Sequence, residues 1–363
     1  MKIVTVTSQK ADNYGAVLQS YALQQTLFEL GFDNEILDVC TPTKNASNLK
    51  VKIRKVLLDI QKFLYFSRNK KLAERFTDFR DNLLVQTKPY RSVEEVQKNP
   101  PDADMYLTGS DQVFALGNAL VPIRFLDFGN PDTVRASYAA SKGLYEKDEK
   151  SIEYLKKRLS QFDCISSREK QGAEYIKNTL GLDCETHIDP VFLLDREQWN
   201  KITPEARIKE PYILCFRMLR HDAFQPLVDK LKRETGWQVV SIQPRADKKL
   251  KADKYLFDVT PQEFVQLIRD AEVVVTTSFH ATAFSIIFKK KFYSLIDYKP
   301  ERAVALCEMF GFVKRLVRKD DTQFAQLDDI DYTSVDSVIA EKRESGLSYL
   351  KQLENYVNEK RNK

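Results

Sequence analysis

The apolar positions of the chain alternate between short runs rich in β-branched residues and longer segments with helical spacing. Residues 3–7 form a short apolar run, residues 16–30 repeat apolar side chains at helical intervals, and residues 35–39 form a second short run. A strand, a helix and a second strand in this order predict a βαβ unit. The chain is therefore expected to begin with a parallel sheet of the α/β class.

The same alternation continues through most of the sequence. We expect further strands at residues 104–108, 134–139, 164–166, 186–188, 212–216, 237–242, 255–259, 272–276 and 292–296. Helices are expected at 69–84, 222–234, 302–311 and 335–356, together with one that begins at Thr260. Thr260 is followed by Pro261 and Glu263, which is the pattern of a capping box with proline in the first helical position.

A polar segment bounded by prolines, residues 204–211, separates the two runs of alternating elements. It predicts an N-terminal domain at 1–203 and a C-terminal domain at 204–330. The helix within 331–363 is expected to pack back on the first domain. A chain of 363 residues is long enough for two domains of ordinary size.

Small and polar residues follow several predicted strands of the first domain. Such corners lie at residues 8–15, 109–112, 140–143, 167–169 and 189–190. In an open parallel sheet, ligands bind outside the carboxyl ends of the strands, so these corners are expected to border one crevice. Any single corner is also compatible with ordinary turn chemistry, and the repetition carries the inference.

In the second domain, the segment at residues 271–288 combines a buried strand with the start of an apolar helix. Thr276, Thr277 and Ser278 supply hydroxyls at the corner, and any of them can cap the helix. Free backbone N–H groups and the helix dipole attract anions there. His280, one of three histidines, lies in this first turn, which suits proton transfer beside a bound phosphate or carboxylate. The alternative is a buried histidine with a purely structural role.

Composition narrows the classes of function. The net charge of +5 permits acidic ligands and does not indicate a nucleic-acid partner. The five cysteines are scattered with no CxxC pair, which indicates a reducing cytoplasm and neither a zinc site nor a disulfide framework. No GxGxxG or GKS/T pattern supports a dinucleotide or P-loop site. The N-terminus does not resemble a signal peptide, and no run approaches the length of a membrane span.

Residues 49–66 have an apolar helical stripe, which includes Ile53, Val56 and Ile60, surrounded by lysine and arginine. A basic amphipathic helix of this kind can lie on an anionic membrane surface, and a peripheral location at the inner face of the membrane follows from that interpretation. The alternative, which is the commoner case, is a surface helix packed on its own domain.

Five segments together resemble the polysaccharide pyruvyl transferase family. They are residues 13–19 (NYGAVLQ), 109–113 (GSDQV), 137–141 (SYAAS), 167–169 (SRE) and 278–284 (SFHATAF). Asp189–Pro190 and the late Arg302 and Arg315 also fit, so the resemblance extends over roughly residues 3–316. Phe114 stands where the family usually has Trp, and Ala281 stands where it usually has Gly.

The resemblance implies two Rossmann-like domains facing across a cleft, as in GT-B glycosyltransferases. It also implies transfer of a pyruvyl group from phosphoenolpyruvate to two hydroxyls of a sugar, giving a cyclic ketal in a polysaccharide or its lipid-linked precursor. This chemistry requires no metal or further cofactor.

The roles that this reaction needs can be assigned to residues of the matching segments. His280 is the candidate acid that protonates the donor, and Asp111 or Asp12 is the candidate base for the sugar hydroxyl. Candidate substrate-binding residues are Asn13, Tyr14, Gly15, Ser110, Gln112, Arg168, Arg217, Ser278, Thr282 and Arg302. Among these, the arginines are expected to meet the phosphate and carboxylate of the donor.

Two other functions remain open at this point. One is a GT-B-type glycosyltransferase that uses a nucleotide sugar, which shares the expected architecture. The other is a sugar- or nucleotide-binding protein without catalysis.

Overall fold

The computed structural model describes residues 1–40, 66–116, 120–141, 148–243, 250–297, 301–327 and 330–362, with the side chains of the first helical segment after residue 65 described from Lys70 onward. Contacts divide these residues into two compact units. The described residues within the bounds 1–41, 83–195 and 332–363 form the first unit, and those within 42–82 and 196–331 form the second. In the described part of the chain, no helix has both the length and the apolar character that crossing a bilayer requires.

The division between the units falls at Asp195 and Arg196, eight positions before the expected boundary at 203 and 204. Helix α8 (Arg196–Ile202) belongs to the second unit because Trp199 packs edge-on against Phe284, with ring centroids 4.9 Å apart.

Helix α3 (Phe66–Leu83) also falls in the second unit, apart from its last residue, although the sequence placed it in the first. The predicted amphipathic helix at 49–66 lies outside the described residues, except for Phe66, where α3 begins.

The first unit contains a parallel sheet with strand order β2-β1-β3-β4. Its main elements are β1 (Lys2–Val6), α1 (Tyr14–Glu29), β2 (Asp33–Ile36), β3 (Met105–Gly109) and β4 (Val134–Tyr138). A short parallel pair, β5 (Ser166–Ser167) and β6 (Glu185–Thr186), continues beside β4 through isolated bridges. The strand order reverses between β1 and β3, so this is the topological switch point where open α/β sheets bind ligands.

Short helices complete the first unit. They are α4 (Val93–Lys98), α5 (Val121–Arg124), α6 (Glu149–Leu159), α7 (Lys170–Tyr175), a π-helical turn (Ile176–Leu180) and a 3₁₀ turn (Pro190–Phe192).

The second unit is a Rossmann-like sheet of six parallel strands in the order β12-β11-β10-β7-β8-β9. The strands are β7 (Tyr212–Phe216), β8 (Gln238–Ile242), β9 (Lys254–Leu256), β10 (Val273–Thr276), β11 (Lys291–Leu295) and β12 (Leu316–Val317). The helices between them are α9 (Phe224–Thr235), α10 (Pro261–Asp270), α11 (Phe279–Ile287) and α12 (Glu301–Met309). Numbered along the unit, the strands follow the order 3-2-1-4-5-6 of dinucleotide-binding folds, which places the switch point between β7 and β10.

The sequence pattern explains the positions of most elements in the second unit. β7 has the predicted bounds, and its five residues are all buried, as expected for a strand covered on both faces. The capping box at the start of α10 is confirmed, since Thr260 Oγ1 accepts from the N–H of Glu263 at 3.1 Å and the Glu263 carboxylate accepts from the N–H of Thr260 at 2.8 Å.

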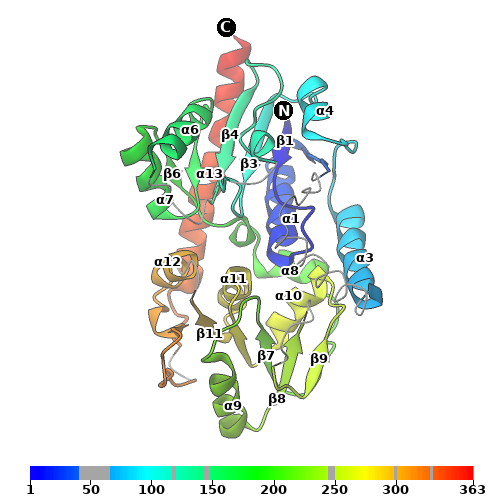
Figure 1. Cartoon of the computed structure of the whole chain (residues 1–363), viewed down its shortest axis with the longest axis vertical. Helices are drawn as coiled ribbons and strands as arrows, with labels where there is room; N and C mark the ends of the chain where they lie inside the picture. The colour runs from blue at the N-terminus through cyan, green and yellow to red at the C-terminus, as the bar shows by residue number, and fades with distance from the viewer. Residues whose placement is uncertain are drawn as a thin grey trace, which may run out of the picture. The chain divides into compact units, whose positions relative to one another are not determined.

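The long helix α13 (Val335–Arg361) packs on the first unit, beside β4 (Figure 1). The Tyr349 hydroxyl donates to the carbonyl of Ser137 at 2.9 Å, and Arg343 donates to the carbonyls of Phe192 and Leu194 at 3.0 and 3.1 Å. The helix continues five residues beyond the expected end at 356, where Lys360 and Arg361 pair with carboxylates of the same unit.

His187 lies at the junction between α13 and the sheet. Its ring centroid is 5.9 Å from that of Tyr138 and 4.5 Å from that of Tyr349, and its Nδ1 is 3.3 Å from the hydroxyl of Ser345. Burial lowers the pKa of His187, and the carboxylate of Glu185, 3.3 Å away but largely exposed, offsets only part of that effect.

We expect this histidine to make folding sensitive to acid. The unfolded chain has an ordinary histidine pKa of about 6.5 and the folded chain a lower one, so the unfolded state binds more protons in between. The free energy of unfolding should therefore fall as the pH drops through about 6.5. His187→Phe keeps a ring between the two tyrosines and cannot titrate. Thermal melts across this range should show a smaller acid-side loss in the variant, and equal slopes would exclude His187 as the cause.

Candidate active site

The polar corners of the first unit meet at its switch point, where the side chain of Gln19 forms hydrogen bonds with two of them. The Gln19 Oε1 accepts from the backbone N–H of Ser110 at 3.1 Å, and its Nε2 donates to Thr7 Oγ1 at 2.7 Å. The Ser110 hydroxyl donates to the carbonyl of Ala139 at 2.8 Å. The carboxyl ends of β1, β3 and β4 are thus joined by hydrogen bonds, and Gln19 is a contributor that the sequence analysis did not single out.

Backbone geometry sets these corners apart from ordinary turns. Gln112 has φ of 57° and Ala139 has φ of 46°, so both non-glycine residues adopt the left-handed region. Such conformations cost of order 1–3 kcal/mol each, and they cluster at sites where the surrounding structure holds them for function.

Arg168 forms the buried centre of this corner. Its guanidinium contacts Asp189 at 2.6 Å and Glu169 at 2.9 Å, and Asp111 lies 3.9 Å away. Burial lowers the pKa of Arg168, but Glu169, Asp189 and Asp111 together outweigh that effect and raise it. The Glu169 carboxylate also accepts a hydrogen bond from the Ser141 hydroxyl at 2.9 Å. Side-chain exposure is 17% for Asp111, 5% for Glu169 and 1% for Asp189, so solvent mainly reaches Asp111.

The remaining predicted residues of the first unit differ in exposure. Asp12 is exposed, and Asn13 is the N-cap of α1, with its Oδ1 accepting from the N–H of Ala16 at 3.2 Å. Tyr14 and Gly15 are buried in the first turn of α1.

A second arginine, Arg124, also reaches this corner, and the sequence analysis missed it. Its Nη2 donates to the hydroxyl of Ser8 at 3.2 Å. Burial lowers the pKa of Arg124, while the charge of Asp111 acts in the opposite direction. Arg124 stands at the end of the four-residue helix α5, and no sequence motif pointed to it.

In the second unit, the hydroxyls of Thr276 and Thr277 join the ends of β7 and β10. Thr276 Oγ1 donates to the carbonyl of Phe216 at 2.7 Å, and Thr277 Oγ1 accepts from the N–H groups of Met218 and Leu219 at 2.9 and 3.2 Å. Of the three candidate caps, it is Ser278 that caps α11. The corner is therefore fixed at the switch point of this sheet.

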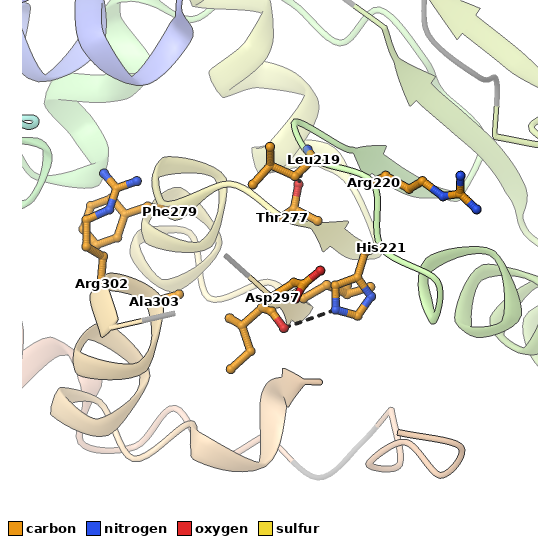
Figure 2. A pocket seen from close by; sticks show the side chains of 10 residues that line it. Leu219, Arg220, His221, Thr277, Phe279, Asp297, Arg302 and Ala303 are labelled. Atoms are coloured by element: carbon orange, nitrogen blue, oxygen red, sulfur yellow. Dashed lines mark hydrogen bonds between the residues drawn. The ribbon is translucent and has the colours of Figure 1, made fainter. Parts of the chain in front are cut away.

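A pocket lies at these strand ends (Figure 2). It is lined by Leu219, Arg220, His221, Thr277, Phe279, Leu295, Ile296, Asp297, Arg302 and Ala303. Figure 2 shows Arg302 and Phe279 side by side, and the guanidinium carbon lies 6.0 Å from the ring centroid. His221 Nε2 is 3.3 Å from the carbonyl oxygen of Ile296. Arg302 gives the pocket a positive charge close to the N-terminus of α11.

His280 is the second residue of α11 and is 5% exposed. Phe279, rather than His280, contributes to the pocket lining, and the two rings pack edge-to-face with centroids 5.0 Å apart. The predicted acid therefore lies in the first turn of the helix, beside the ring of Phe279 and outside the pocket lining.

Two other predicted residues of this unit have different surroundings. Thr282 is fully buried, and its hydroxyl lies 3.1 Å from the carbonyl of Ser278 and 3.0 Å from the hydroxyl of Ser294. Arg217 follows the last residue of β7 and is partly exposed, while Arg220 of the same loop lines the pocket. Arg315 is 1% exposed and lies over the ring of Tyr293, with 5.4 Å between guanidinium and centroid.

Comparison with solved structures defines the class of fold. An α-glucosyltransferase in complex with UDP and a 13-mer DNA containing an HMU base aligns with a TM-score of 0.52 and 9% identity, over 99% of each chain. The N-terminal domain of a Candida albicans trehalose-6-phosphate phosphatase aligns at 0.51 and 10%, over 99% of this chain and 97% of the other. A putative UDP-N-acetylglucosamine 2-epimerase from Listeria monocytogenes aligns at 0.50 and 10%, over 97% and 90%. The chain thus has a GT-B-like fold of two Rossmann-like domains, and at these identities the likeness shows the fold alone.

The family follows from the sequence. The family model for polysaccharide pyruvyl transferase matches residues 13–300, and the chain belongs to this family. No curated protein matches the sequence closely enough to add a particular activity. The matched region includes both switch-point corners, from Asn13 to the start of α11.

Proposed function

We propose that the protein transfers a pyruvyl group from phosphoenolpyruvate to two hydroxyls of a sugar and forms a pyruvate ketal. The observation that supports this proposal most strongly is the extent of the family match. It covers the polar corners at the switch points of both Rossmann-like units. The first-unit corner offers a partly exposed carboxylate, and the second-unit corner offers a cationic pocket beside a histidine.

The proposed donor site is the pocket of the second unit. Phosphoenolpyruvate carries a phosphate and a carboxylate, and Arg302 together with the positive end of the α11 dipole suits either anion. Thr277 and Phe279 limit the space around the anion. His280, on the first turn of the same helix, is proposed to deliver a proton to the methylene carbon of the donor.

The reaction balances with these groups. A proton added to the methylene carbon makes it a methyl group, and the first sugar oxygen bonds to the adjacent carbon as its own proton passes to a carboxylate. The second sugar oxygen then replaces the phosphate on that carbon, and its proton leaves with the phosphate. Asp111 is the proposed base, with exposed Asp12 as the alternative. The products are the cyclic ketal and inorganic phosphate.

The direct test is incubation of the purified protein with phosphoenolpyruvate and a panel of glycans and lipid-linked oligosaccharides. Release of inorganic phosphate that depends on an acceptor, with the pyruvyl mass added to that acceptor in mass spectrometry, would support the proposal. A parallel panel of nucleotide sugars serves as the comparison. Sugar transfer from a nucleotide sugar without phosphate release from phosphoenolpyruvate would overturn it.

We expect Arg302→Ala to weaken donor binding. One charge-assisted contact to an anion is worth roughly 1.5–3 kcal/mol, so the dissociation constant for phosphoenolpyruvate should rise about tenfold or more. The matched control is Arg207→Ala, which removes an arginine of the same unit that pairs with Glu263 at 3.1 Å outside the pocket. Calorimetric titration of both variants measures the effect, and unchanged affinity in Arg302→Ala would place the anion elsewhere.

We further propose that the reaction takes place in the cytoplasm, where phosphoenolpyruvate is made, with a glycan or a lipid-linked oligosaccharide as acceptor. For a lipid-linked acceptor, the basic amphipathic sequence at residues 49–66 would provide contact with the inner face of the membrane. Flotation with anionic liposomes tests this contact, and a protein that stays at the bottom of the gradient would argue against it.

A further inference from the structure

Arg168 is enclosed by acidic side chains, and this arrangement does not suit a residue that binds an anion. Its Nη1 contacts Asp189 at 2.6 Å, its Nε donates to Glu169 at 2.9 Å, and the carboxylate of Asp111 lies 3.9 Å from Nη1. Among these four side chains, three carboxylates surround one guanidinium. Counting Arg124, which is influenced by the charge of Asp111, the corner holds two guanidiniums and three carboxylates. The positive charge of Arg168 is therefore already matched, and an incoming phosphate or carboxylate would face a net negative group.

The carboxylates that hold Arg168 are themselves fixed. Asp189 accepts from the N–H of Val191 at 3.1 Å through its other oxygen. Glu169 accepts from the hydroxyl of Ser141 at 2.9 Å. Because each partner has a second anchor, the planar guanidinium has one orientation, and Nη1 is directed between Asp189 and Asp111.

The backbone of Asp111 is fixed from the other side. Its neighbour Ser110 donates its N–H to Gln19 and its hydroxyl to the carbonyl of Ala139. The main chain at the end of β3 and the cation opposite the carboxylate therefore both restrict the position of Asp111. Asp111 remains the most exposed carboxylate of the group.

We propose that Arg168 is a positioning residue, which Asp189 and Glu169 hold so that it orients the carboxylate of Asp111 toward the acceptor hydroxyl, and that it does not contact the donor. The inference rests on the proposed function in that Asp111 is taken as the base. It replaces the expectation that Arg168 binds the donor anion.

The experiment compares kcat and KM for phosphoenolpyruvate in Arg168→Lys and Asp189→Asn. Lysine keeps the charge but cannot make the same planar set of contacts, so Asp111 loses its orientation. We expect kcat to fall about 10- to 100-fold in Arg168→Lys, because a displacement of about 1 Å can have an effect of this size, with KM for the donor unchanged within about twofold. Asp189→Asn should act in the same direction, although Asp189 is almost fully buried.

A double variant separates positioning from a general loss of structure. If Arg168 acts through Asp111, Asp111→Asn combined with Arg168→Lys should be no slower than Asp111→Asn alone. The matched control is Arg158→Lys, which alters an arginine of the same unit that pairs with Asp127 at 2.9 Å. Its kinetic constants should match those of the wild type. Thermal melts show whether each variant folds. If Arg168→Lys does not fold, the kinetic constants of Asp189→Asn are used for the test instead.

Two outcomes would overturn the inference: a rise of about tenfold or more in KM for phosphoenolpyruvate in Arg168→Lys with kcat preserved, or additive losses in the double variant. If the wild type releases no phosphate from phosphoenolpyruvate with any acceptor, the proposed function fails instead. In that case, crystal structures of the wild type and Arg168→Lys decide whether Arg168 positions the Asp111 carboxylate. A displaced Asp111 carboxylate supports positioning, and an unmoved one excludes it.

Discussion

The His280→Asn variant is expected to lose about 10²- to 10⁴-fold in turnover while keeping most of its affinity for phosphoenolpyruvate. This range is typical for the loss of a general acid. Asparagine keeps a polar side chain of related shape in the first turn of α11 but cannot deliver a proton near neutral pH. Steady-state turnover and calorimetric donor affinity, measured on the same preparation, give the two quantities.

The control for this prediction is the His187→Phe variant described above. It removes another buried histidine, which lies next to Glu185 and Ser345 of the first unit and has no proposed role in chemistry. Thermal melts establish that both variants fold. Near wild-type turnover in folded His280→Asn would remove His280 from the mechanism, and a loss of donor affinity equal to the loss of turnover would make it a ligand for the phosphate.

Gly109→Ala is expected to have the largest effect on stability. Gly109 ends β3, and a Cβ atom at this position would overlap the backbone carbonyl oxygen of Tyr138 on the neighbouring strand. A backbone atom in a buried sheet cannot move aside cheaply, so the cost should lie at the upper end of the roughly 1–3 kcal/mol seen for overpacking. Since Ser110 and Asp111 follow directly, activity should fall with stability.

Gly346→Ala is the matched comparison, because it introduces the same methyl group against the same tyrosine. In α13, a Cβ at position 346 would overlap the hydroxyl of Tyr138, which is the far end of a side chain. A ring can shift slightly, so we expect a smaller loss of stability and little change in turnover. Denaturant unfolding of both variants tests the ranking. A Gly109→Ala protein as stable as the wild type would show that the corner is not close-packed.

The sequence predicted the framework well because strand burial and helix periodicity are local signals. β7 has its predicted bounds, and the capping box of α10 formed as expected. The start of α11 is an example of a local signal that left a choice open. Three hydroxyls were equivalent in the sequence, and only Ser278 accepts from the N–H that a cap must satisfy.

Contacts between distant segments limited the prediction of the site. The position of Arg168 depends on Asp189, which is 21 positions away, and on Asp111, which follows the end of β3. Neither of these contacts can be predicted from the periodicity of apolar residues in the sequence. Thr282 was a candidate because it stands in a motif beside His280, yet its hydroxyl is used within the packing of α11 against Ser294 of β11. Arg124 was missed because its helix has only four residues.

The position of α13 has a consequence for the order in which the protein can assemble during synthesis. The described strands of the second unit lie between residues 212 and 317, so its sheet is complete in the chain before α13 is made. The hydrogen bond from Tyr349 to Ser137 joins positions 212 residues apart and cannot form until the helix has left the ribosome. The first unit therefore cannot reach its native form, in which α13 packs beside β4, until this last helix has been made, whereas the strands of the second unit are already present in the chain.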